Sequence, residues 1–160
     1  MNGRGSDGIR LFPVHGLPEI TPGDDLAAMI AATTTLAHRD VVVVTQKVVS
    51  KAEGRLVDVN PETGHKPLVE AESVRILRRR GDLTISETAH GFICANAGVD
   101  LSNVADGTAA LLPVSPDRSA RRIRDALRHQ VGFEVAVVVS DTFGRPWRRG
   151  VTDVAIGCSG

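Results

Sequence analysis

The 160-residue chain contains no tyrosine, four phenylalanines, one tryptophan and two cysteines. So few aromatic rings argue against the base-stacking platforms of proteins that bind single-stranded nucleic acid. Cys94 and Cys158 lie far apart in the sequence and form no CxxC pair, which indicates a reduced cytoplasmic protein rather than a disulfide scaffold. The five histidines form no HxH or HExxH grouping. Any metal is therefore expected to be a hard cation held by oxygen atoms.

Excess charge of one sign and long apolar runs are also absent. Nineteen basic and 19 acidic residues give zero net charge, so no global field attracts nucleic acid or an anionic membrane. No apolar run approaches the length of a membrane span, and the N-terminus lacks the apolar core of a signal peptide. We expect a cytoplasmic protein with no nucleic-acid or membrane partner, a flexible N-terminus over residues 1–8 and one domain over residues 9–160.

The hydrophobic pattern predicts a mixed α/β (α+β) fold. Three helices are expected, from Leu26 to near Leu36, over Leu68–Arg80 and over 116–131. An Asp before Leu26, Ser115 with Pro116, and Gly132 are the expected caps. Short apolar runs predict strands at Ile9–Val14, Val41–Thr45, Leu83–Ser86, Gly91–Ala95, Val135–Val139 and Val151–Gly157.

The stretch from residue 135 to residue 150 carries the first chemical signal. Its apolar run Val135–Val139 has the pattern of a strand buried on both faces, followed by the oxygen-bearing side chains of Ser140-Asp141-Thr142. Gly144 permits a tight turn and Pro146 removes a hydrogen-bond donor, so we expect the strand to end before them. A carboxylate close to guanidinium groups indicates a site for a metal ion and a phosphorylated ligand. Those guanidinium groups belong to Arg145, Arg148 and Arg149.

Two further stretches place polar residues after apolar strands. Gln46, Lys47 and Lys51 follow Val41–Thr45, either at the rim of the sheet or in a solvated loop or helix start. Asp100 and Asn103 follow the strand that ends near Ala95, and they either face one ligand or stabilise their own turn.

Asp100 and Asp141 are the candidate pair of carboxylates. Two carboxylates about 4 Å apart repel by roughly 4 kcal/mol at an effective dielectric constant near 20, and a divalent cation between them reverses that effect. The nucleotide-binding patterns GxxxxGK[ST] and GxGxxG are absent. The residues therefore indicate metal-assisted phosphoryl chemistry on a small anionic substrate.

Several blocks of the chain resemble the coenzyme F-420:L-glutamate ligase family. They occur in the family's order, and the resemblance covers the chain from Leu11 to Gly160. The blocks are FPVHGLP (residues 12–18), SKAEGR (50–55), NAGVDLSN (96–103), LLP (111–113) and SDTFGR (140–145).

The resemblance implies a mixed α/β fold, a homodimer and a GTP-dependent ligase. Such a ligase adds L-glutamate to the precursor of the deazaflavin coenzyme F-420 through an acyl phosphate, with Mg²⁺ or Mn²⁺, and K⁺ is a further candidate cofactor. Residues 9–160 would be the N-terminal part of the ligase domain, with its C-terminal portion missing. The implied catalytic residues are Asp100, Asp141 and Lys51, and the implied metal ligands are Asp100, Asp141 and Thr142. The implied nucleotide contacts are Leu17, Pro18, Glu19, Ile20, Gln46, Lys47, Lys51 and Asn103.

Two alternatives from other functional classes remain open. The chain could be a module that binds a nucleotide or deazaflavin, or only dimerises, without turnover. A metal-dependent phosphatase would release phosphate from GTP without needing glutamate.

Overall fold

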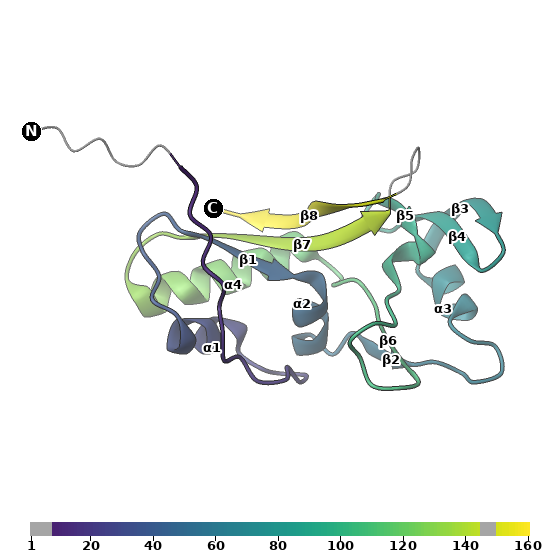
Figure 1. Ribbon diagram of the computed structural model, residues 1–160, viewed down its shortest axis with the longest axis horizontal. Helices are drawn as coiled ribbons and strands as arrows, with labels where there is room; N and C mark the ends of the chain where they lie inside the picture. Colours follow the sequence, from purple (N-terminus) through teal and green to yellow (C-terminus); the bar gives the residue numbers. More distant parts are fainter. Residues whose placement is uncertain (1–7, 145–149) are drawn as a thin grey trace, which may run out of the picture.

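The computed structural model describes residues 8–144 and 150–160 of the chain. Residues 1–7, in the N-terminus predicted to be flexible, and the loop residues Arg145, Pro146, Arg148 and Arg149 lie outside the described residues. In chain order the elements are α1 (Leu26–Thr33), β1 (Val41–Thr45), α2 (Gln46–Ala52), β2 (Leu56–Asp58), α3 (Lys66–Ala71), β3 (Ser73–Arg80), β4 (Leu83–Thr88), β5 (Ile93–Ala95), the 3₁₀ turn η1 (Asn96–Gly98), β6 (Thr108–Ala110), α4 (Pro116–Val131), β7 (Ala136–Gly144) and β8 (Val151–Ser159) (Figure 1). The predicted mixed α/β fold is confirmed.

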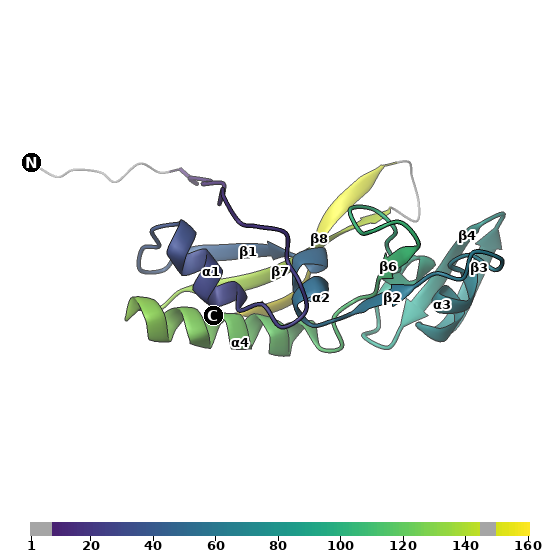
Figure 2. The same cartoon turned by 90° about the horizontal axis from the view of Figure 1, so that it is seen from below.

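The elements form two groups along the long axis of the molecule (Figures 1 and 2). One group contains a three-stranded sheet of order β1-β7-β8, in which β1 is parallel and β8 antiparallel to β7. The other contains the antiparallel pair β2-β6 and the antiparallel sheet β3-β4-β5. Strand β7 reaches from the first group towards the second, so its C-terminal end lies where the two groups meet (Figure 1).

The main core lies on one face of the sheet β1-β7-β8. Helix α4 carries apolar side chains at three- and four-residue spacing, which makes one face of the helix hydrophobic. That face packs against the alternate, inward-facing residues of β1 and β7. The buried set comprises Ala120, Ile123 and Leu127 of α4, Val42 and Val44 of β1, and Val137 and Val139 of β7.

The expectation of a strand buried on both faces is wrong. In β7 only alternate residues are fully buried, and Val138 is half-buried. In β1 the side chains of Val41 and Val43 are 58% and 62% exposed. A continuous apolar run cannot distinguish a doubly covered strand from one whose second face is apolar but open, because period and composition are the same in both.

The helix predicted over Leu68–Arg80 is also wrong in its second half. Helix α3 ends at Ala71, and Ser73–Arg80 forms β3, which pairs with β4 through the two-residue turn Gly81-Asp82. Gly81 has φ of 60°, as a tight two-residue hairpin requires. The apolar spacing suggested a helix face, but Val74 and Leu77 are 69% and 48% exposed, so no such face is buried.

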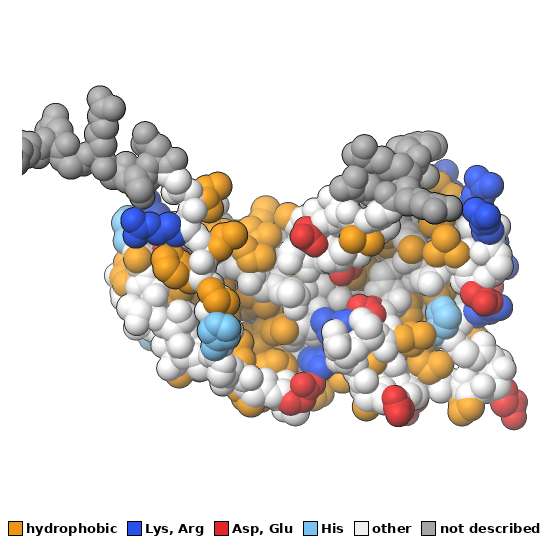
Figure 3. All heavy atoms as spheres, in the orientation of Figure 1, with side chains coloured by type: hydrophobic (Ala, Val, Ile, Leu, Met, Phe, Trp, Pro, Cys, Tyr) orange, Lys and Arg blue, Asp and Glu red, His pale blue; other side chains and the backbone are white. Residues whose placement is uncertain are grey.

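The first strand, predicted over Ile9–Val14, is not formed either. This segment has no regular structure, and Ile9, Leu11 and Phe12 are 93%, 89% and 74% exposed. Figure 3 shows hydrophobic side chains gathered over the face where this segment and β1 lie.

The remaining element predictions are confirmed, with shifts of a few residues. Asp25 caps α1 by accepting the N–H of Ala28 at 3.0 Å, although this helix ends at Thr33 rather than near Leu36. Helix α4 begins at Pro116 and ends where Gly132 adopts φ of 78°. Among residues 8–144 and 150–160, no helix combines the length and hydropathy that a bilayer crossing needs.

Candidate active site

Strand β7 is longer than the sequence predicts, and Asp141 lies within it. The expected strand ends in Ser140-Asp141-Thr142, before Gly144, whereas β7 includes Gly144, because β8 pairs with it as far as Val151. A register shift in this pairing lies between Val139 and Ser140, directly before Asp141. Such bulges bend a strand and re-aim the side chains that follow, and they are frequent next to active sites.

The second carboxylate comes from the turn after β5. Asn96, Ala97 and Gly98 have consecutive left-handed φ angles of 50°, 52° and 72°. This conformation costs an alanine roughly 1–2 kcal/mol, and the burial of Ala97 (2% exposed) in the second core cluster offsets it. At Gly98 a Cβ would lie only 2.7 Å from Leu112 Cγ, so no side chain fits there. The turn places Asp100 beside β6, where its backbone exchanges two hydrogen bonds with Ala110.

Asp100 and Asp141 line one pocket of about 110 Å³, together with Thr142 and Cys94. The structure therefore brings the predicted pair of carboxylates to one site, Asp141 from strand β7 and Asp100 from the turn after β5. Burial is the main reason that the pKa of Asp141 is raised, and the charge of Asp100 adds to the rise. The same burial, together with the Asp141 charge, raises the pKa of the Cys94 thiol to about 11, so this thiol is protonated at neutral pH.

Lys47 neutralises Asp100. Its Nζ lies 2.8 Å from Asp100 Oδ2 and donates to Ser102 Oγ at 2.7 Å. Ser102 holds the other oxygen, since its N–H and its hydroxyl both donate to Asp100 Oδ1 at 2.8 Å. Burial acts to raise the pKa of Asp100, but the hydrogen bonds from Lys47 and Ser102 outweigh it and lower that pKa.

The raised pKa of Asp141 predicts a pH-dependent stability effect. Folding favours its protonated form, so the stability from that form is present below the ordinary pKa of 3.8 and is lost as pH rises through the folded-state pKa. Asp141→Asn stays neutral at every pH. Without divalent cations we expect this variant to melt at a higher temperature than the parent at pH 7, and the difference to shrink towards zero as pH falls to 3.8. A lower melting temperature for the variant at pH 7 would contradict this assignment.

Thr142 and its partner complete the strand end. The Thr142 hydroxyl donates to Asp153 Oδ1 at 2.8 Å, and its N–H donates to Asp141 Oδ1 at 2.8 Å. The next residue, Phe143, meets Phe92 edge-on with ring centroids 5.8 Å apart, and Phe92 stacks on His90 at 5.7 Å. These ring contacts fix the end of β7 against the β4–β5 turn of the other group.

Helix α2 links this site to the N-terminal segment. Lys47 and Lys51 are four residues apart and thus lie on the same face of the helix. Lys51 forms an ion pair with Glu19, while Ile20 is buried in the main core.

The other predicted nucleotide contacts differ in exposure. Leu17 is half-buried, whereas Pro18 and Asn103 are exposed. Gln46 is 2% exposed and donates to Ser50 Oγ and Leu111 O at 2.7 Å and 3.1 Å.

The oxygen atoms at the site suit a hard cation. Asp100, Asp141 and Thr142 could supply two carboxylates and one hydroxyl, the donor types that Mg²⁺ prefers. Within residues 8–144 and 150–160 no group of three or more His, Cys, Asp or Glu side chains could hold a metal ion. A divalent cation would therefore need further oxygen atoms besides those of Asp100, Asp141 and Thr142, and water or the phosphates of a ligand are suitable sources.

A family model described as F420-0:Gamma-glutamyl ligase matches residues 16–160 of the chain. The chain belongs to this ligase family. It is 43% identical over 174 residues to the coenzyme F420:L-glutamate ligase of Methanothermobacter thermautotrophicus, an alignment that covers 96% of this chain and 69% of that protein. The protein of the same name from Methanopyrus kandleri is 45% identical over 170 residues, with 95% and 67% of the two chains covered. The resemblance stated from the sequence is thereby confirmed.

Two contacts of this ligase-family site are not predicted from the sequence. The first is Ser102, which bridges Lys47 and Asp100; its position two residues after an Asp is the signal of an Asx turn. The second is Asp153, which faces Thr142 across the β7–β8 pair. Its signal was that it is the acidic residue of the returning strand, but only the register identifies its partner.

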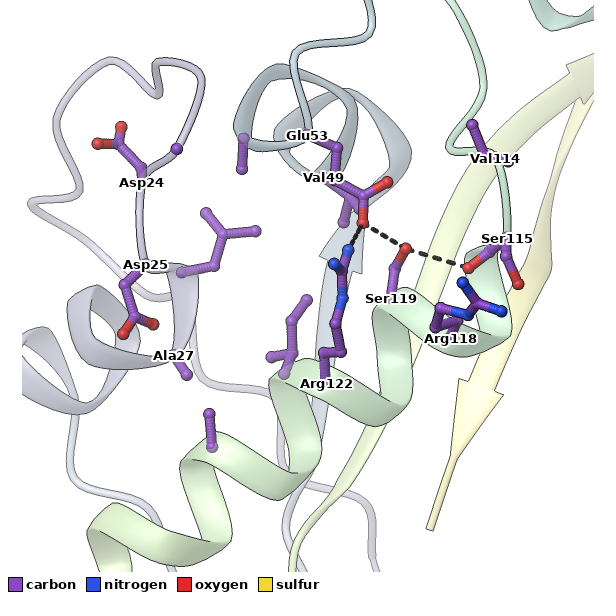
Figure 4. A pocket seen from close by; sticks show the side chains of 15 residues that line it. Asp24, Asp25, Ala27, Val49, Glu53, Val114, Ser115, Arg118, Ser119 and Arg122 are labelled. Atoms are coloured by element: carbon purple, nitrogen blue, oxygen red, sulfur yellow. Dashed lines mark hydrogen bonds and ion pairs between the residues drawn. The ribbon is translucent and has the colours of Figure 1, made fainter.

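A second, larger cavity of about 540 Å³ lies between α1, α2 and α4 (Figure 4). Among residues 8–144 and 150–160, its lining shares none with the pocket of Asp100 and Asp141. At its edge the Glu53 carboxylate accepts a hydrogen bond from Ser119 Oγ at 2.6 Å and pairs with Arg122 (Figure 4). Glu53 thus ties the end of α2, the helix that carries Lys47, to α4.

Glu53→Ala should lower the free energy of unfolding by about 1–2 kcal/mol, because Ser119 and Arg122 lose a charged acceptor whose side chain is only 19% exposed. Urea denaturation measures the effect. Glu70→Ala is the matched control, since the Glu70–Arg79 pair is more than half exposed on both sides and should contribute less than about 0.5 kcal/mol. Equal losses in the two variants would mean that Glu53 does not tie α2 to α4.

Proposed function

We propose that this protein joins L-glutamate by an amide bond to the precursor of the deazaflavin coenzyme F-420, with GTP as the phosphoryl donor. Membership of the ligase family and the names of the relatives support the ligation. The observation that carries the proposal for this chain is the pocket in which Asp100 and Asp141 meet beside Lys47. Such a combination of carboxylates and an ammonium group suits the binding of a phosphate chain with its cation.

In the proposed reaction a carboxylate oxygen of the precursor bonds to the γ-phosphorus of GTP as the P–O bond to the β-phosphate breaks, and GDP leaves. The amine of glutamate then attacks the resulting acyl phosphate, forming the C–N bond as the C–O bond to phosphate breaks and the amine loses a proton. A bound Mg²⁺ or Mn²⁺ supplies neutralisation of the phosphate charge. Asp100, Asp141 and Thr142 are its proposed ligands.

The lysines of α2 contact the nucleotide phosphates in this proposal. Lys47 and Lys51 share one face of the helix and are 16% and 11% exposed, so both are partly shielded from water. Interactions of a phosphate with such groups are stronger than on an open surface, because solvent screens them less. Lys51 is the proposed catalytic lysine. The N-terminal segment at Glu19, which pairs with Lys51, would contact the nucleotide.

A homodimer belongs to the same proposal. The open face of β1 exposes Val41 and Val43, and the segment before α1 exposes Leu11 and Phe12. Apolar side chains gathered on one face in this way are typical of surfaces that another chain covers.

The test of the function is to incubate the full chain with GTP, Mn²⁺, L-glutamate and the deazaflavin precursor in buffer containing K⁺. Mass spectrometry should detect the precursor with added glutamate, and omission of GTP should abolish that product. Release of phosphate without glutamate would instead support a phosphatase.

Binding without turnover is the second candidate. The chain covers 67–69% of the length of the relatives from M. kandleri and M. thermautotrophicus. Calorimetry distinguishes it: binding of GDP with Mn²⁺ but no glutamate product supports a binding module. If neither binding nor product is found, the proposed function is wrong for this chain.

A further inference from the structure

Lys47 places a positive charge next to the two carboxylates of the site, Asp100 and Asp141. Its ammonium contacts Asp100 Oδ2 at 2.8 Å, and its charge reaches Asp141, since it partly opposes the rise of that residue's pKa. The Lys47 side chain is 16% exposed. A lysine therefore supplies positive charge beside two neighbouring carboxylates.

The two oxygens of Asp100 are held differently. Oδ1 accepts two hydrogen bonds from Ser102, one from its backbone and one from its hydroxyl, and these bonds fix the orientation of the carboxylate. Oδ2 is held by the mobile end of a long side chain, Lys47. A cation bound between Asp100 and Asp141 would keep the Ser102 bonds and meet the ammonium at Oδ2.

We propose that Lys47 and a divalent cation compete for Asp100, and that the displaced ammonium transfers to a phosphate of the nucleotide. This inference rests on the proposed function. The exchange keeps the charge of the site balanced in both states: Lys47 neutralises Asp100 before the cation binds, and the nucleotide phosphates neutralise Lys47 afterwards. No covalent step is involved.

The position of Lys47 allows this transfer. It lies in the first turn of α2, four residues before Lys51, so both ammonium groups lie on the face proposed to meet the phosphates. Lys51 is held by Glu19, a residue 77% exposed, and has no part in the Asp100 contact. The two lysines of one helix thus differ in one respect: Lys47 opposes cation binding, whereas Lys51 does not.

The exchange couples the two ligands. A nucleotide that attracts Lys47 away from Asp100 makes cation binding easier, and by reciprocity the cation raises nucleotide affinity by the same factor. Direct binding of Mn²⁺, measured by the paramagnetic resonance of free Mn²⁺ with and without GDP, tests this without any turnover.

In the absence of nucleotide, Lys47→Met should bind Mn²⁺ at least about fivefold more tightly than the parent, the lower end of typical coupling between sites. GDP should increase Mn²⁺ affinity in the parent but much less in this variant. Lys47→Arg keeps the charge and should retain the parent's weaker Mn²⁺ binding. Lys51→Met is the matched control: it should bind Mn²⁺ like the parent when GDP is absent. Melting temperatures confirm that each variant is folded.

If the parent binds Mn²⁺ and Lys47→Met binds it equally or more weakly, the competition is refuted while the proposed cation site stands. An equal gain in Lys51→Met would also refute it, because the effect would then reflect net charge alone. If neither the parent nor the variants bind Mn²⁺, both this inference and the cation site of the proposed function are wrong.

Discussion

Asp141→Asn is expected to lower glutamate ligation by about 10³-fold, because it removes a proposed cation ligand without removing the side chain's shape. Loss of metal-assisted charge stabilisation is worth several kcal/mol, and each 1.36 kcal/mol is a factor of ten in rate. Steady-state turnover at saturating GTP and Mn²⁺ measures the loss. The variant still offers an oxygen to the N–H of Thr142, so the local hydrogen bond at 2.8 Å can be retained.

The control for this prediction is Asp58→Asn, an exposed Asp on β2. It makes the same change of charge and should leave turnover within about twofold. The expected stability of Asp141→Asn makes the result decisive, because a variant that is more stable at neutral pH and yet inactive has not lost activity by unfolding. Near-parental turnover of Asp141→Asn would remove this residue from the proposed mechanism.

Gly157→Ala is expected to destabilise the fold by about 3 kcal/mol, the upper part of the range for overpacked cores. Gly157 lies in β8 where α4 begins to cross it, and a Cβ there would lie 2.4 Å from the carbonyl carbon of Pro116. That neighbour is backbone and cannot rotate away. The start of α4 is also tied to β8 by the Cys158 N–H, which donates to Asp117 Oδ1 at 2.9 Å.

Gly144→Ala is the matched control for Gly157→Ala. Gly144 is also in the β7–β8 pair, but a Cβ there would meet no atom of residues 8–144 and 150–160 within 4 Å. We expect its stability to change by less than about 0.5 kcal/mol, since an alanine that fits also reduces the entropy of the unfolded chain. Urea unfolding of both variants separates the two cases. If the two glycine variants are equally stable, α4 can move away from β8 at little cost.

The sequence pattern predicted an element correctly where residues within that element determine its structure. Helix α4 is the clearest case: Pro116 at its start, Gly132 at its end and the apolar spacing of Ala120, Ile123 and Leu127 all agree with the helix found. The same spacing misled for Leu68–Arg80, because three apolar residues matched a helical period by coincidence. There the pairing of β3 with β4 overrides the pattern, and pairing is a property of two segments rather than one.

The candidate site divides in the same way. Its residue types were predictable, since Asp100 and Asp141 each come after a run of apolar residues. The contacts that tune these carboxylates were not. Lys47 reaches Asp100 from a helix 53 residues earlier in the chain, and Asp153 meets Thr142 only through the register of β7 with β8.

By itself the sequence determined the family, the mixed α/β class and the two acids of the site, because motifs and hydrophobic periods are written in consecutive residues. Only the tertiary structure decided that β7 continues to Gly144, that one face of the sheet stays open, and that an ammonium group lies on Asp100. Each of these depends on which distant segments come within hydrogen-bonding or ion-pairing distance. That proximity results from the packing of the whole chain, so it cannot be predicted from the sequence of a single segment.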